Sequence, residues 1–376
     1  MGTLRLGSSV VVPSTVKQTT VPATIDPLSI TPTTSQQIIN ATASIDGYAP
    51  VTVNAVTSAI DANITAGNIK KDTVILGVIG TYEGNTFYGI RKSKQRIGLN
   101  VVISSVPELI DLSTIGVIGD YALAYAYYNT SFTTATSFNF PTIVRIANRG
   151  MQGFNKQNEQ FTQNNITAVG FPALTEVNKY GLAEFLSGVY YNTADFSNKT
   201  IDFSAVTYAG EYAFYKAFDG FNQYNNNASA IFDFSSLQTV NNYCFNYAFA
   251  NTKIASVDFS KVKTINAHGF DSAFYSARFS SSSINIYFPA LTTLGDSAFA
   301  EAFSYTGNQP ILYFPALTSN SFGNYTNQFH DMLKGCYSTW VHFPSNLQSV
   351  IGSWSDVTSG FGGTNIYVLF DLPATE

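Results

Sequence analysis

One short phrase recurs along this chain and restricts the folds that it can form. The five letters FPALT occur at 171–175, 288–292 and 314–318. Weaker copies bring the number of anchor positions to nine, spaced 25 to 32 residues apart. The anchors are Leu112, Phe140, Phe171, Phe203, Phe234, Phe259, Phe288, Phe314 and Phe343. A period of this size predicts a solenoid, in which each repeat forms one coil and stacks on its neighbours.

The residues before each anchor predict a short strand. The position two residues before the anchor is apolar in eight repeats: Phe138, Val169, Ile201, Phe232, Val257, Ile286, Leu312 and Val341. Apolar residues at alternate positions indicate a strand with one buried face. The proline or serine that follows most anchors then ends the strand.

The residues after the anchor predict a short helix. Apolar pairs recur 11 and 15 residues beyond it: Leu182/Leu186, Phe214/Phe218, Phe245/Phe249, Phe270/Phe274, Phe299/Phe303 and Tyr325/Phe329. A spacing of four places both side chains on one helix face. The expected fold is therefore an α/β repeat, a leucine-rich-repeat-like solenoid of about nine coils with a parallel sheet and short helices.

A second set of letters resembles a known repeat family. The segments IGDYA at 118–122, GEYAF at 210–214 and GDSAF at 295–299 are similar to the core of BspA-like leucine-rich repeats. The resemblance covers about 107–370. It implies recognition of surfaces rather than catalysis. The chain departs from the family in its longer Asn- and Tyr-rich return loops, and it loses the pattern at Met151, Tyr325 and the last repeat.

The first hundred residues have a different organisation. Residues 1–30, rich in Thr, Val, Ser and Pro, predict an extended arm. Residues 31–84 predict a small mixed α+β module with strands at 50–56 and 72–78 and a short helix that begins near 58 and ends at Gly67. Residues 85–106 are expected to form a linker and cap, and residues 107–376 the solenoid.

The words of the 31–84 module resemble a segment of virion proteins from tailed bacteriophages. They are ITP at 30–32, GYAPVTVNAV at 47–56, IDANI at 60–64, NIKK at 68–71 and ILGVIGTYEG at 75–84. The resemblance implies a tail-associated virion protein, made in the host cytoplasm and placed on the virion exterior. It also implies that residues 1–84 contact other virion proteins. The first residues lack the apolar run of a secretory signal, which agrees with this expectation.

Composition excludes two classes of partner. Charged residues are 11% of the chain and the net charge is −5, so nucleic acid is not an expected partner. No apolar run reaches the roughly 18 residues of a membrane helix, so membrane insertion is not expected. Aromatic residues are 15%, with 23 tyrosines, which favours binding through ring contacts and hydrogen bonds. Cys244 and Cys336 belong to repeats three coils apart, so no disulfide between them is expected.

Catalytic and metal motifs are weak. The chain has no nucleophile elbow or phosphate loop, and only three histidines. His330, Cys336 and His342 are evenly spaced but lack the close pairs and the fourth ligand of a zinc site. The expectation is a non-enzymatic protein without metal or cofactor.

The residue directly before each anchor faces away from the core and forms an outward column. Asp202, Asp233 and Asp258 would form an acidic ladder, because neighbouring parallel strands lie about 4.8 Å apart. Either a bound cation or hydrogen bonds from nearby Ser, Thr and Asn side chains would compensate the repulsion. Tyr287, Tyr313, Trp340 and His342 would form an aromatic face that either contacts a ligand or covers the last coils.

The leading functional prediction is a structural protein of a tailed-phage virion. It is expected to form a homo-oligomer in the particle. Its solenoid would be displayed outward, as in a tail or baseplate fibre, and would bind a host-surface glycan or protein. A capsid decoration or head-fibre protein and a bacterial BspA-like adhesin are the alternatives. A glycan-cleaving spike would need two carboxylates in a groove, and Asp202 with Asp233 is the nearest pair.

Overall fold

The computed structural model divides the chain into two compact units, 1–82 and 83–376, each described by itself. The described residues are 36–39, 51–53, 64–69, 71–75, 78–81, 83, 85–87, 102–103, 112, 114–132, 136–157, 163–164, 166–191, 199–221, 229–280, 283–306, 309–323, 327–337, 339–351, 361–363 and 366–374. The unit boundary falls within two residues of the predicted module end at 84. The predicted arm at 1–30 and the predicted helix start near 58 lie outside the described residues.

The first unit contains two short antiparallel strand pairs. Strand β1 (Gln37–Ile39) pairs with β2 (Val51–Val53), which confirms part of the predicted strand at 50–56. Strand β3 (Val74–Ile75) pairs with β4 (Val78–Ile79), so the single strand predicted at 72–78 is wrong. The chain reverses within that segment, and a 3-10 turn, η2 (Ala66–Asn68), precedes it. Ile69 of this unit is buried, whereas Ile38, Val74, Ile75 and Ile79 are exposed.

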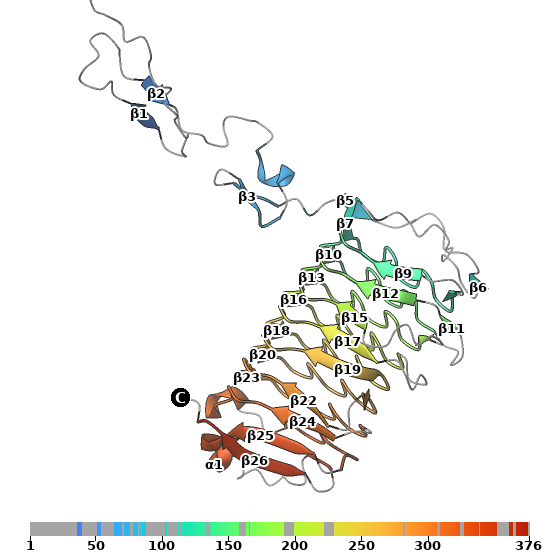
Figure 1. Ribbon diagram of the computed structural model, residues 1–376, viewed down its shortest axis with the longest axis vertical. Coiled ribbons are helices and arrows are strands. Elements are labelled where there is room, and N and C mark those ends of the chain that lie inside the picture. The colour runs from blue at the N-terminus through green and yellow to red at the C-terminus, as the bar shows by residue number, and fades with distance from the viewer. Residues whose placement is uncertain are drawn as a thin grey trace, which may run out of the picture. The chain divides into compact units, whose positions relative to one another are not determined.

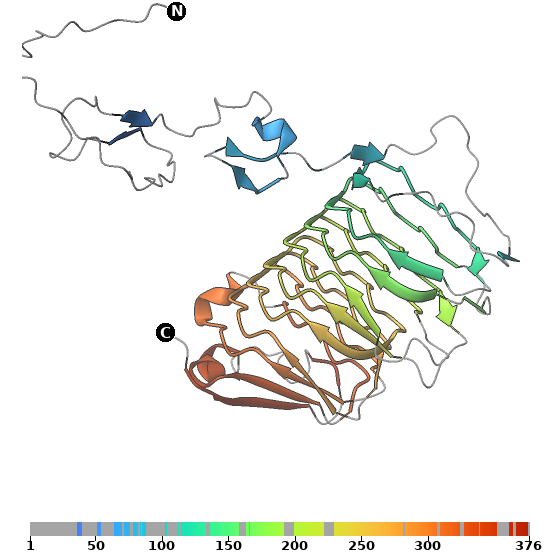
Figure 2. The same ribbon diagram turned by 45° about the horizontal axis from the view of Figure 1, so that its top comes forward.

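The second unit is a parallel β-solenoid, as the repeat predicted (Figures 1 and 2). Its longest sheet has eight strands: β5 (Asn85–Phe87), β7 (Ile115–Ile118), β10 (Arg145–Ile146), β13 (Glu176–Val177), β16 (Tyr208–Ala209), β18 (Thr239–Val240), β20 (Thr264–Ile265) and β23 (Thr293–Leu294). A second sheet has six strands: β9 (Thr136–Asn139), β12 (Ile166–Gly170), β15 (Lys199–Asp202), β17 (Ala230–Asp233), β19 (Lys253–Asp258) and β21 (Arg278–Phe279). A third has four: β22 (Ser283–Tyr287), β24 (Gln309–Tyr313), β25 (Trp340–Pro344) and β26 (Tyr367–Leu372).

The ends of the solenoid differ from its regular part. At the start, β5 from the predicted linker pairs with β7, so this linker contributes a rung. Two further two-stranded sheets join β6 (Val102–Ile103) to β8 (Ser131–Phe132), and β11 (Gln163–Asn164) to β14 (Tyr190–Tyr191). At the other end, the last two repeats replace the strand after the anchor by η4 (Ser319–Phe322), and by η5 (Ser345–Leu347) with α1 (Gln348–Ile351). Among the described residues, six repeats, with anchors from Phe140 to Phe288, therefore have a strand on both sides of the anchor, whereas the sequence predicted about nine coils.

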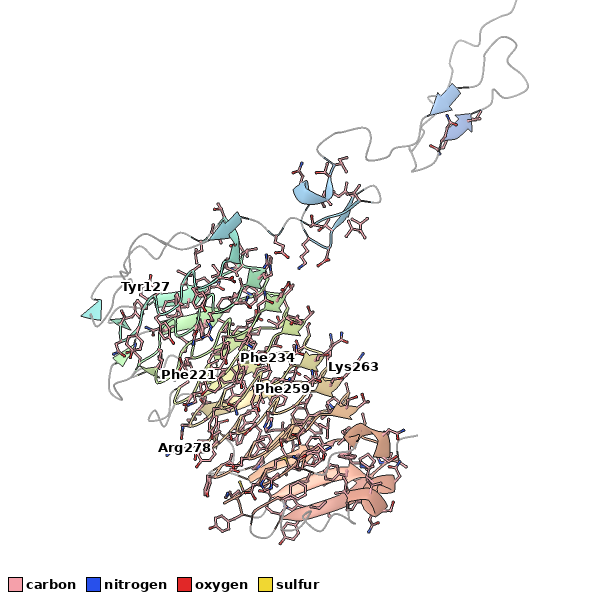
Figure 3. All side chains as sticks on the ribbon, turned by 180° about the vertical axis from the view of Figure 1, so that it is seen from behind. Tyr127, Phe221, Phe234, Phe259, Lys263 and Arg278 are labelled. Carbon is pink, nitrogen blue, oxygen red and sulfur yellow. The ribbon has the colours of Figure 1, made fainter. Side chains whose placement is uncertain are left out.

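The predicted strand register is confirmed over most of the solenoid. Phe138, Val169, Ile201, Phe232 and Val257 pair in order across the six-stranded sheet. Ile286, Leu312 and Val341 do the same in the four-stranded sheet. The anchor phenylalanines lie two residues further along the chain and also face the interior, where they stack from coil to coil. The ring centroids of Phe234 and Phe259, for example, are 5.3 Å apart (Figure 3).

The helices predicted after each anchor are not present. Among the described residues the one α-helix is the four-residue α1, and the segments after the anchors are successive β-turns. The N–H groups of Ala213 and Ala217 donate to carbonyl groups three residues earlier, and the third residues of these turns, Tyr212 and Lys216, have φ of 55° and 51°. Every second N–H, such as that of Phe214, donates to the next coil instead. A turn repeated every four residues thus places Phe214 and Phe218 inward with the spacing that a helix would give.

Both cysteines are buried and unpaired, which confirms the predicted absence of a bond between them. Burial raises the pKa of both thiols. Because the thiolate is the reactive form, neither cysteine should react with a thiol reagent such as DTNB at pH 8 while the chain is folded. Two thiols per chain should react in denaturant. Fast labelling of the native protein would contradict this prediction.

Candidate ligand-binding face

Three aromatic side chains form a row along the outer face of the four-stranded sheet. Tyr287, Tyr313 and His342 pair in register on β22, β24 and β25, as the outward column predicted. The ring centroids of Tyr287 and Tyr313 are 4.4 Å apart, and those of Tyr313 and His342 are 4.5 Å apart. The in-register strands bring the rings to stacking distance, because they present equivalent positions at every rung.

A second row lies beside the first. Trp340 is two residues before His342, so both side chains leave β25 on the same face. Trp340 pairs with Tyr367 of β26, and their ring centroids are 4.6 Å apart. The sequence prediction did not include Tyr367. The available signal is the pair of apolar residues Val368 and Phe370, two positions apart, which is the pattern of the strands before the other anchors.

The five residues of these two rows form the aromatic patch: Tyr287, Tyr313, Trp340, His342 and Tyr367. Tyr287, Trp340 and Tyr367 are 49%, 40% and 44% exposed. The buried side of the same strands is filled by Ile286, Leu312 and Val341, so the rings do not supply the core of the last coils. This separation favours a contact role over the alternative in which the rings cover the coil interior.

Stacking determines which atoms the aromatic patch presents. Rings stacked face to face along the solenoid offer mainly their edges, the phenol hydroxyls and the indole N–H to a partner. His342 Nδ1 lies 2.9 Å from a carboxylate oxygen of Asp371. Burial, together with the neighbouring Tyr287, raises the pKa of Tyr313, so its phenol is neutral at physiological pH. The patch is thus suited to hydrogen bonding and apolar contact, with one flanking carboxylate.

The acidic ladder is present as predicted, and its carboxylates accept hydrogen bonds from the backbone where the strands end. Asp202, Asp233 and Asp258 pair in register. Their Oδ1 atoms accept hydrogen bonds from the backbone N–H groups two residues later, at 2.9, 2.9 and 2.8 Å. The donors at these three bonds are backbone groups and not the side chains that the alternative named, although Ser204 Oγ also donates to Asp202 Oδ1 at 2.7 Å. Within the described ranges none of the three carboxylates forms an ion pair.

The histidines and cysteine considered for zinc are not brought together. Cys336 is buried, where its sulfur lies 3.0 Å from the carbonyl oxygen of Phe303, whereas His342 pairs with Asp371. In the part of the chain that the structure describes, no three His, Cys, Asp or Glu side chains cluster as metal ligands.

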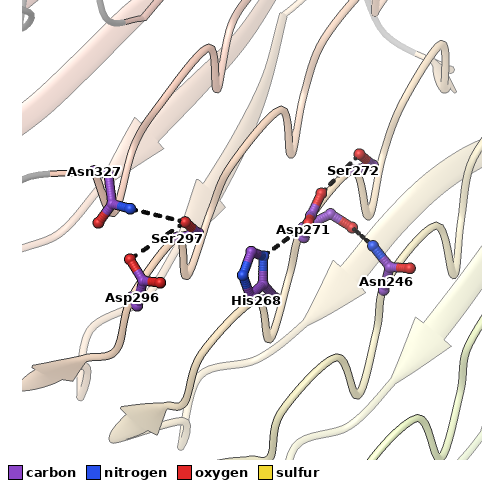
Figure 4. A network of polar contacts seen from close by, with 7 residues as sticks. All are labelled: Asn246, His268, Asp271, Ser272, Asp296, Ser297 and Asn327. Carbon is purple, nitrogen blue, oxygen red and sulfur yellow. Dashed lines mark hydrogen bonds and ion pairs between the residues drawn. The ribbon is translucent and has the colours of Figure 1, made fainter.

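A further ladder, which the sequence prediction missed, runs along the turns. Tyr180, Tyr212, Tyr243 and His268 stack in successive coils with centroid separations of 4.8, 4.8 and 4.5 Å. The guanidinium of Arg149 continues it, 4.2 Å from the Tyr180 ring centroid. At the other end His268 Nδ1 lies 2.9 Å from Asp271 within a group of polar contacts (Figure 4).

Each member of this turn ladder occupies the same place in its turn. All lie nine residues after an anchor, which is the signal that the sequence offered. All have positive φ, between 54° and 56°. A bulky residue in this region is strained, and stacking on both neighbours offsets part of the cost. The turn ladder is therefore understood as a stabilising feature of the coils.

Comparisons with protein-family models, curated proteins and solved structures found no match to this chain. No helix among the described residues is long and apolar enough to cross a membrane.

Proposed function

We propose that this chain is a non-enzymatic virion structural protein of a tailed bacteriophage. In this proposal its N-terminal region, residues 1–84, attaches to other virion proteins, and its solenoid is displayed outward to bind a host-surface glycan or protein. The placement in a virion rests on the resemblance of residues 30–84 to virion proteins. The similarity of residues 107–370 to BspA-like repeats supports a recognition role.

The observation that carries the binding role is the aromatic patch. Its rings lie on the outer face of regular strands, are 40% or more exposed at three positions and are not needed to fill the core. Exposed aromatic side chains gathered on a rigid sheet are typical of binding surfaces, in which a few such residues supply most of the energy. A tail or baseplate fibre is the preferred assignment, and a head fibre or decoration protein would use the same surface.

The test replaces Tyr313 and Trp340 by alanine in otherwise intact particles. Each truncation of a binding hot spot costs about 2 kcal/mol or more, so the double variant should attach to host cells at least about 100-fold more weakly. Particle yield and incorporation of the protein should stay normal, because neither ring fills the core.

The matched control is Tyr208→Ala, which removes a 49% exposed ring from β16 on a different sheet. This control should leave attachment unchanged. Normal attachment by the double variant would contradict the binding role of the patch. Absence of the protein from purified particles, measured by mass spectrometry, would contradict the virion assignment.

A further inference from the structure

Three walls enclose the core of the solenoid: the eight-stranded sheet, the turns, and an outer wall made of the six- and four-stranded sheets. The outer wall is interrupted between β19 and β22. These strands lie next to each other, yet they belong to different sheets and share no ladder. Elsewhere six anchor N–H groups, those of Phe140, Phe171, Phe203, Phe234, Phe288 and Phe314, donate to the next coil at 2.9–3.1 Å. The N–H of Phe259 makes no such bond within the described residues. This interruption is called the seam.

Packing behind the seam is also looser. The ring centroids of Phe259 and Phe288 are 6.1 Å apart, whereas the anchor pairs on either side are 5.3 and 5.5 Å apart. Val257 is half-buried, although its counterparts Phe232 and Ile286 are buried. Solvent therefore reaches an inward position at this rung and at few others.

The sequence contains a cause for the seam. Ile254 and Phe279 pair in register, but Ile254 lies five residues before its anchor and Phe279 lies nine before its own. Four additional residues thus enter this coil, at the serine run 280–283. The later strand, β22, is in register with β24 and not with β19.

The other two walls continue across the same coils. Thr264 and Ile265 pair with Thr293 and Leu294 in the eight-stranded sheet. On the turn side, the N–H groups of His268 and Phe270 donate to the next coil at 2.9 Å. The outer wall keeps the pairing of β21 with β19 at Arg278 and Phe279, so it is open only between that pair and the anchor, whereas the other two walls are continuous.

We propose that the seam divides the solenoid into two cooperative blocks, and that residues 283–374 separate from the preceding coils as a unit before those coils unfold. In a solenoid, stability depends on the interface between neighbouring coils, and at this interface the outer wall has lost its hydrogen bonds next to the anchor, beyond the β19–β21 pair. The entire aromatic patch lies on the block after the seam, so it keeps its internal geometry when the block moves. The proposal is independent of what the patch binds.

The test is native-state hydrogen exchange of the intact chain, read by mass spectrometry at increasing denaturant. Without denaturant, the Phe259 amide should exchange at least about tenfold faster than the amides of Phe234 and Phe288. With denaturant, amides in 283–351 should lose protection together, at a lower concentration than amides in 199–258. Simultaneous loss in both regions, or a gradual loss that spreads from the last strand, would overturn the proposal.

A deletion variant provides the second arm. Removal of residues 280–283 restores the spacing found in the preceding coil, so Phe259 should become protected and the two blocks should exchange together. The control removes four residues, 224–227, from the Asn-rich segment that precedes β17 in the sequence, and β17 is paired in register with β15. The control should leave the two-block pattern in place. A folded 280–283 deletion in which Phe259 still exchanges fast would overturn the proposal, and if this variant does not fold, exchange of the unaltered chain decides.

Discussion

Replacing Phe245 by alanine is expected to lower the free energy of unfolding by roughly 3–5 kcal/mol, the usual cost of emptying a large aromatic core position. The Phe245 side chain is 0% exposed. It stacks between Phe214 and Phe270, with both centroids 5.1 Å away, and the edge of Phe234 meets it at the same distance. Hydrogen bonds hold the backbone of the adjacent coils at fixed spacing, so the cavity cannot close by collapse.

Denaturant titration followed by circular dichroism measures this loss, with Phe299→Ala as a second core position that should behave alike. The control is Tyr208→Ala, because a 49% exposed ring outside the core should change stability by no more than about 0.5 kcal/mol. Equal losses at Phe245 and Tyr208 would contradict the assignment of the inward positions.

Replacing Gly188 by alanine is expected to cost roughly 3 kcal/mol, through the backbone rather than the core. Gly188 has φ of 72°, and a Cβ atom there would lie 2.3 Å from the carbonyl oxygen of Gln157. The N–H of Gln157 donates to the adjacent Ser187 at 2.8 Å, and the N–H of Gly188 donates to Asp219 at 2.7 Å. Relief of the clash would therefore break bonds to the coils on both sides.

The matched control is Gly170→Ala in β12. The nearest atom to a Cβ there is the side-chain oxygen of Asn139, at 3.2 Å, and the next two are also side-chain atoms, of Asp202 and Pro172. A small movement of Asn139 accommodates the methyl group, so thermal unfolding should change little. A Gly188→Ala variant as stable as Gly170→Ala would show that the turns can move apart without loss.

The strand register was predictable from sequence because it depends on one simple pattern. Apolar residues at alternate positions before each anchor determine which side chains face inward, and the repeat determines which ones become neighbours. Asp202 and Asp233, and Tyr287 and Tyr313, therefore lie where the outward column predicted. Tyr367 was missed because the phrase after the anchor is absent from the last repeat.

The turns were mistaken for helices because a spacing of four is shared by both. The distinguishing signal lies 17 residues after the anchor, where Gly188, Gly220 and Asn251 occupy positions of positive φ. Earlier turns in the same coils place Tyr212 and Lys216 in that region, and these residue types do not indicate it. Ring stacking and hydrogen bonds between coils stabilise those turns, and neither is visible in one repeat alone.

The columns of like residues also bear on how a chain of this kind can vary in length. Each regular coil presents nearly the same surface to the coil before it and the coil after it, so a coil inserted between two others meets neighbours that already fit. Whole coils can therefore be gained or lost by duplication or deletion, each changing the reach of the solenoid by about 4.8 Å while the aromatic patch stays unaltered at its far end. The length of the solenoid and the surface of the aromatic patch would then be able to change independently within a single polypeptide.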